Sequence, residues 1–484
     1  MLFNSIEFAI FLPIIFILYW LVSNQNLKFQ NLLLLGASYS FYAWWDWRFL
    51  SLIVFSSTID YIVGLKLSST TNERKRKILL FTSIFVNIGF LGFFKYFNFF
   101  SEGFAQAFTL LGHPFETSRL NIILPVGISF YTFQTLSYSI DVYRRKISPT
   151  RNVIAFFSFV SFFPQLVAGP IERATNLLPQ FYKKRNFNYL NAVDGLKQIL
   201  WGLFKKVVIA DNCAIIVNDI FANYASYSGS TLILGAIFFA FQIYGDFSGY
   251  SDIAIGTARL FGFNLMQNFA FPYFSRDIAE FWRRWHISLS SWFRDYLYIP
   301  LGGSRGSFSE KIRNIFIIFI VSGFWHGANW TFIIWGALNA LYFLPLLLLK
   351  TNRNNLNIAA EKKVFPSIRE VGNILLTFSL TVFAWIFFRA ESITHAISFI
   401  KHLFINLYIE IPNIICVGKF DLLITSFLIM IFIIIEWMGR EGQYAIERYT
   451  SNWNKVIRWS FYYIIAFLII LFSDKSENFI YFQF

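Results

Sequence analysis

Long stretches without Asp, Glu, Lys or Arg recur along the whole chain. Examples of at least 14 residues are 8–26, 29–45, 78–94, 120–140, 152–171, 220–245, 314–349, 371–388, 422–435 and 459–473. A helix needs about 20 largely apolar residues to cross a hydrocarbon core roughly 30 Å thick. The pattern therefore predicts an all-α polytopic membrane protein with about 11 transmembrane helices.

The composition excludes an ordinary soluble protein. Only 14% of the residues are charged and 56% are hydrophobic, whereas soluble domains carry roughly 25% charged residues. The two cysteines, Cys213 and Cys416, are far apart and have no neighbouring histidines, so no disulfide framework and no metal site is expected. Residues 1–22 lack a basic start and a small-residue cleavage site, which indicates a retained first span. We interpret 1–484 as a single membrane-embedded domain.

The formal net charge of +14 does not indicate nucleic-acid binding. The basic residues are interleaved with the apolar stretches and form no contiguous face, so no nucleic-acid partner is expected. Basic loops of membrane proteins lie mostly in the cytoplasm, and the clusters at 74–77 and 144–146 are assigned to that side. The resulting orientation places both termini outside the cytoplasm and the polar loop 350–370 inside it.

Residues 152–171 do not fit a simple crossing, because basic clusters flank this stretch on both sides. The stretch contains Pro164, Gly169 and Pro170, which disfavour a regular helix. A broken backbone is tolerated at membrane depth only where protein or water surrounds it. The sequence therefore predicts a re-entrant or broken segment here.

Residues 191–218 have apolar side chains at helical spacing, with Lys197, Lys205 and Lys206 available to the polar side. This pattern is typical of a helix at the cytoplasmic membrane interface. Membrane lipid is the first expected partner of these lysines, and the phosphates of an acyl donor are the second.

A histidine lies within the longest charge-free stretch. At about 1.5 Å per residue, His326 is roughly 20 Å along a helix that starts at Arg313, near or beyond the middle of the bilayer core. One helix through 314–349 would be too long for a bilayer, so a break is expected at Gly323 or Gly327. A neutral imidazole at this depth can act as a general base. The alternative is a core histidine hydrogen-bonded between helices.

Arg283, Arg284 and His286 form a second candidate group, in the sequence Trp-Arg-Arg-Trp-His. On one helix the two tryptophans and His286 share a face. The group can serve as a cationic, aromatic wall that holds an anionic donor and presents His286 to the cavity of His326. The alternative is an interfacial belt of arginine and tryptophan.

Asp246 and Asp252 lie at the end of another apolar stretch. The surrounding Gly-Asp-Phe-Ser-Gly does not fit the nucleophile elbow of serine hydrolases. We expect both carboxylates to cap helices or to pair with Arg283, Arg284 or Arg294.

Four motifs in order resemble the bacterial branch of the membrane-bound O-acyltransferase (MBOAT) family, and within it the enzymes that O-acetylate alginate and other polysaccharides. The motifs are Pro-Gln-Leu-Val-Ala-Gly-Pro-Ile-Glu-Arg (164–173), Asp-Phe-Ser-Gly-Tyr-Ser-Asp (246–252), Phe-Trp-Arg-Arg-Trp-His (281–286) with residues 292–303, and Ser-Gly-Phe-Trp-His-Gly-Ala-Asn-Trp (322–330). The likeness extends over nearly the whole chain.

The resemblance implies helices around a central funnel in the bacterial inner membrane. It implies transfer of an acetyl group from cytoplasmic acetyl-CoA to a hydroxyl reached from the other side, with an extracytoplasmic acetyltransferase as partner and an acetylated exopolysaccharide as product. His326 would be the general base or acid and His286 a positioning or oxyanion partner. The candidates for holding the donor are Arg283, Arg284, Lys205 and Lys206.

Two other functions stay open on the sequence. A D-alanyl transferase to teichoic acid would have the same fold and take its acyl group from a carrier protein. A glycan or lipid transporter would use the same cavity without acyl chemistry, although proton-coupled carriers usually place carboxylates within their spans.

Overall fold

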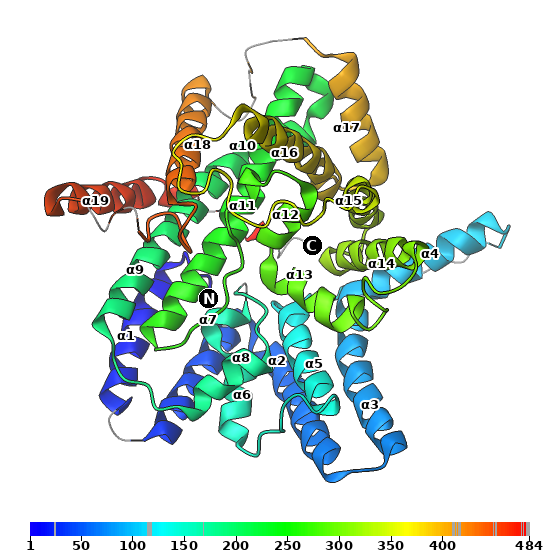
Figure 1. Cartoon of the computed structure of the whole chain (residues 1–484), viewed down its shortest axis with the longest axis vertical. Coiled ribbons are helices and arrows are strands. Elements are labelled where there is room, and N and C mark those ends of the chain that lie inside the picture. The colour runs from blue at the N-terminus through cyan, green and yellow to red at the C-terminus, as the bar shows by residue number, and fades with distance from the viewer. Residues whose placement is uncertain are drawn as a thin grey trace. The chain divides into compact units, whose positions relative to one another are not determined.

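The computed structural model describes residues 1–23, 26–113, 119–167, 169–408, 412, 414, 418–448, 450, 453–475, 477 and 479–480. Every regular element in these ranges is a helix, which confirms the predicted all-α class (Figure 1). The chain forms two compact units. The first comprises Met1–Val193 and Thr257–Met266, and the second comprises Asp194–Gly256 and Gln267–Phe484.

The first unit contains α1 (Ile6–Ser23), α2 (Leu27–Ser69), α3 (Glu73–Leu91), the π-helical η1 (Gly92–Tyr96), α4 (Phe97–Leu110), α5 (Ile128–Tyr143), α6 (Val153–Ser161), α7 (Phe163–Leu166), α8 (Ala174–Leu177), the 3-10 helix η2 (Leu178–Tyr182) and the start of α9 (Tyr189–Leu203). Helix α2 packs against α3, α5 and α6 (Figure 1). Asp60 of α2 accepts hydrogen bonds from Ser83 and Asn87 of α3 and from Ser139 of α5. Such polar contacts fix how apolar helices meet, since hydrophobic packing alone is not directional.

The second unit contains the rest of α9, the π-helical η3 (Phe204–Ala210), α10 (Asp211–Ala222), η4 (Tyr224–Ser226), α11 (Gly229–Leu260, whose end belongs to the first unit), η5 (Pro272–Phe274), α12 (Ile278–Arg284), α13 (Ile287–Phe293), the π-helical η6 (Arg294–Tyr298), α14 (Phe308–His326), α15 (Trp330–Leu348), α16 (Ile368–Arg389), α17 (Ile393–Ile405), α18 (Lys419–Gly439), α19 (Lys455–Leu471) and η7 (Ser473–Lys475). Ser307 and Ser367 begin α14 and α16 as capping boxes with Glu310 and Glu370.

Six helical stretches of the described residues are long and apolar enough to cross a membrane. They are Leu27–Ser69, Glu73–Leu110, Gly229–Leu260, Trp330–Leu348, Ile368–Arg389 and Lys419–Gly439, and shorter apolar helices cover Ile6–Leu21, Val153–Leu166 and Ile393–Ile405. The expected number of about 11 spans stays a prediction, because these six helices are selected by length and composition alone. Helices and charge-free stretches do not correspond one to one, since α2 runs for 43 residues with a kink at Asp46.

The predicted break in residues 152–171 is confirmed. Helix α6 has nine residues, so it is about 14 Å long, half the thickness of a hydrocarbon core. Phe162 has non-helical backbone angles (φ −53°, ψ 107°), and Pro164 stands in the first turn of α7. Proline has no N–H to continue the preceding helix, which explains the break at this point.

The lysine face predicted for residues 191–218 is wrong at two positions. Lys205 and Lys206 are only 3% and 1% exposed. They lie in η3, whose wide π-helical turn interrupts the regular helix. A Cβ atom added to Gly249 of α11 would lie 2.7 Å from the backbone oxygen of Gly202. Because these glycines let α11 reach the backbone of this segment, the lysines face α11 and not lipid.

The predicted break beside His326 is confirmed. His326 is the last residue of α14, Gly327 is extended, and the Asn329 side chain accepts a hydrogen bond from the Thr331 N–H to begin α15. Gly323 lies within α14, where an added Cβ would overlap the backbone oxygen of Phe332. Gly327 therefore marks the break, and Gly323 permits the close contact of α14 with α15.

Candidate active site

Two buried histidines of the second unit contact the same tryptophan ring. The ring centroid of Trp325 is 6.0 Å from that of His286 and 4.9 Å from that of His326. His286 is 1% exposed and His326 is 3% exposed. The structure therefore brings together the two histidines that the sequence singled out, with Trp325 as their common neighbour.

Aromatic rings enclose His326. The rings of Trp335 from α15 and Phe388 from α16 each have their centroid 5.2 Å from the imidazole. Trp385 stacks on Trp335 at 5.6 Å. An enclosure of this kind excludes water and strengthens every electrostatic interaction within it.

The prediction of one helix through residues 282–286 is wrong. Helix α12 ends at Arg284, Trp285 is extended, and His286 has a left-handed backbone (φ 43°) before α13 begins at Ile287. The extended residue places the Trp285 ring 5.6 Å from Phe281 and 5.1 Å from Trp385. A left-handed conformation is unfavourable for a residue with a side chain and persists only where packing holds it. The burial of Trp285 thus sets the direction of His286.

Asn268 fixes the tautomer of His286. The backbone N–H of Ser288 donates to Asn268 Oδ1 at 3.3 Å, and the Ser288 hydroxyl donates to the same oxygen at 2.9 Å. Because a backbone N–H can only donate, the accepting atom of Asn268 is its oxygen. Nδ1 of His286, 3.0 Å from that oxygen, must therefore carry the proton and donate it. Nε2 keeps its lone pair, and it is buried without a hydrogen-bond partner among the described residues.

His286 lies outside the six candidate spans and is held neutral. Burial lowers the pKa of His286 to about 3, because desolvation penalises the imidazolium form. Phe247 and Phe269 provide the apolar surroundings, with ring centroids 4.6 Å and 6.3 Å from the imidazole. Near neutral pH, His286 therefore presents Nε2 as a hydrogen-bond acceptor.

Arg283 and Arg284 bind the loop that precedes α16. Arg283 donates to the backbone oxygens of Asn352 and Asn355 at 3.0 and 2.7 Å. Arg284 pairs with Glu280 at 2.9 Å and donates to the Asn357 oxygen at 2.9 Å. Both guanidinium groups thus have partners within the protein.

Asp246 and Asp252 pair with lysines and not with the predicted arginines. Lys205 Nζ is 2.5 Å from Asp252, and Lys206 Nζ is 2.8 Å from Asp246 and 2.7 Å from Asp211. The prediction is wrong because both aspartates lie within the continuous α11, on the helix that the glycines bring against η3. The charges of the two lysines are therefore balanced by buried carboxylates.

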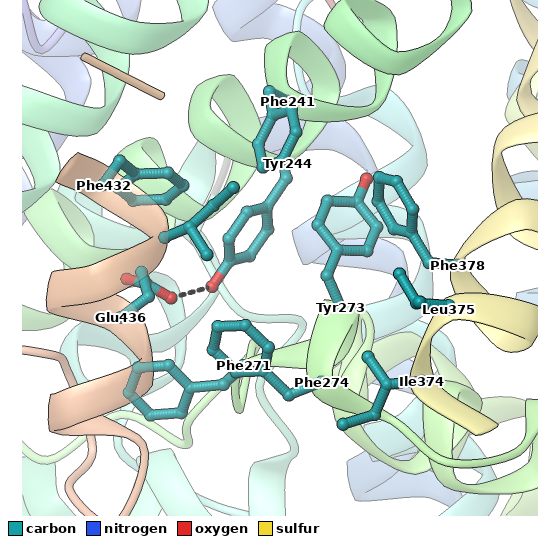
Figure 2. A pocket seen from close by; sticks show the side chains of 11 residues that line it. Phe241, Tyr244, Phe271, Tyr273, Phe274, Ile374, Leu375, Phe378, Phe432 and Glu436 are labelled. Atoms are coloured by element: carbon teal, nitrogen blue, oxygen red, sulfur yellow. Dashed lines mark hydrogen bonds between the residues drawn. The ribbon is translucent and has the colours of Figure 1, made fainter. Parts of the chain in front are cut away.

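An apolar pocket of about 200 Å³ lies next to this network, between α11, α16 and α18. Figure 2 shows the Tyr244 hydroxyl pointing to Glu436 at one side of a wall of phenylalanines. Tyr244 donates to one oxygen of Glu436 at 2.6 Å and Trp201 donates to the other at 3.1 Å. Both oxygens of the Glu436 carboxylate thus accept hydrogen bonds from within the protein. The remaining lining is apolar, so the pocket suits an apolar ligand.

Sequence reasoning missed Asn268 and Trp385. No signal in the sequence marks them, because each acts through a contact with a residue distant in the chain. Cys213 is a buried free thiol, and Cys416 lies outside the described residues. Within the described ranges, no three His, Cys, Asp or Glu side chains are grouped as metal ligands.

Comparison with known proteins places this arrangement in a family. The profile of the membrane-bound O-acyltransferase family matches residues 144–388, which include both histidines. A Pseudomonas aeruginosa protein named "Probable alginate O-acetylase AlgI" is 42% identical over 396 residues, 81% of this chain and 73% of its own length. The Helicobacter pylori peptidoglycan O-acetyltransferase is 38% identical over 430 residues, 83% of this chain and 79% of its own length.

A more distant relative is the teichoic acid D-alanyltransferase of Streptococcus thermophilus, 30% identical over 237 residues, 46% of this chain and 56% of its own length. The family profile and the two similar acetylases cover most of the helices described above. A transporter without acyl chemistry is thereby set aside. The chain, with its several apolar helices and its paired histidines, belongs to the membrane-bound O-acyltransferase family and is a multi-pass membrane O-acyltransferase.

Proposed function

We propose that the chain O-acetylates a polysaccharide, taking the acetyl group from cytoplasmic acetyl-CoA and passing it to a hydroxyl on the other side of the membrane. The names of the relatives that cover most of the chain, an alginate O-acetylase and a peptidoglycan O-acetyltransferase, support a polysaccharide acceptor. The observation that carries the proposal is the contact of Trp325 with both buried histidines, since it places two imidazoles at one enclosed site.

His326 acts as the general base and then as the general acid. The acceptor oxygen attacks the thioester carbonyl carbon while His326 takes the proton of the hydroxyl. The carbon–sulfur bond then breaks, and the departing sulfur receives that proton from His326. The products are an acetyl ester and a free thiol. The aromatic enclosure supports this role, because it keeps water from competing with the hydroxyl.

His286 acts as a positioning residue. With the proton on Nδ1, its Nε2 can accept a hydrogen bond from a second hydroxyl of the acceptor, next to the one that reacts, and cannot donate one to an oxyanion. The tautomer therefore favours the positioning role over the oxyanion role. Arg283, Arg284, Lys205 and Lys206 have partners within the protein, so we propose that these residues shape the site and do not hold the donor.

The two units act together as one membrane-embedded acyltransferase domain of the bacterial inner membrane. The termini lie on the extracytoplasmic side, and the loop 350–370 lies in the cytoplasm, as the distribution of basic residues indicates. Membrane lipid surrounds the protein. An extracytoplasmic acetyltransferase is the partner that receives the acetyl group or completes its transfer to the polysaccharide.

Turnover of labelled acetyl-CoA by the purified protein in nanodiscs tests the proposed donor. We expect thiol release that depends on a polysaccharide or a small glycan acceptor. A folded protein that leaves acetyl-CoA intact but discharges an acylated carrier protein would instead support a second candidate function, D-alanyl transfer to teichoic acid. The partial match to the D-alanyltransferases motivates this arm of the test.

Replacing Asn268 with alanine is expected to lower kcat by about 10- to 100-fold, by analogy with the loss that follows when the hydrogen-bond partner of a metal-ligating histidine is removed. The physical reason is that His286 then loses its fixed tautomer and Nε2 is no longer always the acceptor. KM for acetyl-CoA should change less than kcat. Steady-state kinetics in nanodiscs measure both constants.

The conservative variant Asn268→Asp separates orientation from packing. A carboxylate oxygen still accepts a hydrogen bond from Nδ1–H, so activity should recover in part, and the added negative charge raises the pKa of His286. The acidic limb of the kcat profile should then move to higher pH, because His286 is protonated sooner as the pH falls. Equal losses in both variants, with no shift of the profile, would show that Asn268 has only a structural role.

A further inference from the structure

A polar cavity of about 540 Å³ lies in the first unit. His286 and His326 belong to the second unit and do not line it. Its walls come from residues 176–191, from 259–264 and from Trp20 of α1. This volume falls within the range of about 300–1,000 Å³ that is usual for small-molecule sites. None of the features discussed for the acyl transfer uses this cavity.

Among the residues that the structure describes, four cationic side chains and no carboxylate line the cavity. The cations are Lys183, Lys184, Arg185 and Arg259. Lys183 and Lys184 are exposed and form no ion pair among the described residues. Glu172, which lies close to one wall, accepts hydrogen bonds from the Asn176 side chain and the Met266 N–H. The charges of Lys183 and Lys184 are therefore not balanced by an ion pair among the described residues.

Neutral donors add to the positive potential. Asn188 accepts a hydrogen bond from the Asn191 N–H at 3.0 Å and so begins α9 at the cavity wall. The first turn of a 15-residue helix carries free N–H groups and the positive end of its dipole. Carboxamides, including Asn186, Asn188 and Asn191, also line the cavity. N–H groups beside fixed cations are the usual elements of phosphate recognition.

The walls are held in place without a ligand. Arg185 is 5% exposed and donates to the Gln180 oxygen, to Gln30 and to Asn31. Its Nε is buried and has no hydrogen-bond partner in the part of the chain that the structure describes. Gln180 and Asn264 exchange two hydrogen bonds of 2.9 Å across the cavity wall. Such a pre-formed site loses little entropy when it binds.

Apolar side chains stand beside the cavity. Phe187, Tyr189 and Leu190 are 51%, 70% and 75% exposed, and Phe187 packs on Trp20 with ring centroids 5.3 Å apart. A basic site flanked by exposed apolar groups is typical of the membrane interface. We propose that this cavity binds a phosphate ester, carried by the headgroup of an anionic membrane lipid or by coenzyme A.

Binding of defined probes to the full-length protein tests the proposal without any turnover, so its outcome is independent of the proposed function. The probes are dioctanoyl phosphatidylglycerol, coenzyme A and, as a phosphate-free control, dioctanoylglycerol. Titration in a neutral detergent, followed by native mass spectrometry, yields an apparent Kd for each probe. We expect at least one phosphate probe to bind the wild type more tightly than dioctanoylglycerol, and the tighter phosphate probe identifies the source.

The variant pair decides whether the phosphate binds at this cavity. The double variant Lys183→Gln, Lys184→Gln should raise the apparent Kd of the phosphate probe by about tenfold or more, because two cations near an anionic group are lost. The matched control, Lys75→Gln with Lys77→Gln, removes the same charge from exposed positions of α3 and should change Kd by less than about twofold. The proposal is overturned if neither phosphate probe binds or if the Lys183 and Lys184 variant binds like wild type. It is also overturned if both double variants lose the same amount of affinity for the phosphate probe.

Discussion

Replacing His326 with alanine is expected to reduce acetyl transfer by about 10³-fold, within the range of 10²- to 10⁴-fold that general acid–base catalysis contributes. The physical reason is that the acceptor hydroxyl loses the group that takes its proton in a site enclosed by Trp325, Trp335 and Phe388. Release of free thiol and formation of labelled ester from acetyl-CoA that is labelled in its acetyl group, measured in nanodiscs, report the two halves of the reaction.

The control for this variant is His113→Ala, because His113 is an exposed histidine after α4. It should keep wild-type turnover. His326 is buried, so size-exclusion profile and thermal stability must show that the alanine variant is folded. A folded His326→Ala protein that retains its transfer rate would show that His326 is not the base. If His286→Ala then loses about 10³-fold of the transfer rate, the general base is His286.

Replacing Lys206 with alanine is expected to lower the free energy of unfolding by about 3–5 kcal/mol, the usual cost of leaving a buried charge without its partner. Lys206 is 1% exposed and forms ion pairs with both Asp211 and Asp246. It also donates to the Glu477 oxygen at 2.9 Å. The measurement is the midpoint of thermal or denaturant unfolding in detergent, with KM for acetyl-CoA measured on the remaining folded protein.

A charge-removing variant separates electrostatics from loss of volume. Lys206→Met combined with Asp211→Asn and Asp246→Asn removes all three charges at nearly constant size, so it should recover most of the lost stability. Lys401→Ala, at an exposed position of α17, is the matched lysine control and should unfold like wild type. If Lys206→Ala leaves stability unchanged but raises KM for the donor, Lys206 holds the donor and the structural role is wrong.

The breaks in the helices could be predicted because their signals are local. Pro164 cannot continue α6, and the stretch around His326 is too long to cross a bilayer as one helix. Both features follow from the backbone chemistry of residues that are neighbours in the chain. The family motifs also lie in continuous segments, so the two histidines could be singled out without the structure.

The partners of the charged residues could not be predicted in the same way. Lys206 meets Asp246 across 40 positions of sequence, and the contact exists because Gly202 and Gly249 let two helices approach. A sequence shows that charges must be paired in an apolar body, but it does not show which pairs form. For this reason Arg283 and Arg284 were expected to meet the donor and instead bind the loop before α16.

Hydropathy and the positions of proline and glycine act over short distances, so the membrane-embedded, all-helical class, the main helix breaks and the candidate histidines His286 and His326 follow from the order of the amino acids. The left-handed conformation of His286, the proton on its Nδ1 and the burial of Lys205 and Lys206 are apparent only in the folded chain. These features depend on side chains such as Asn268 and Trp285, whose contacts are made by packing between segments distant in the chain.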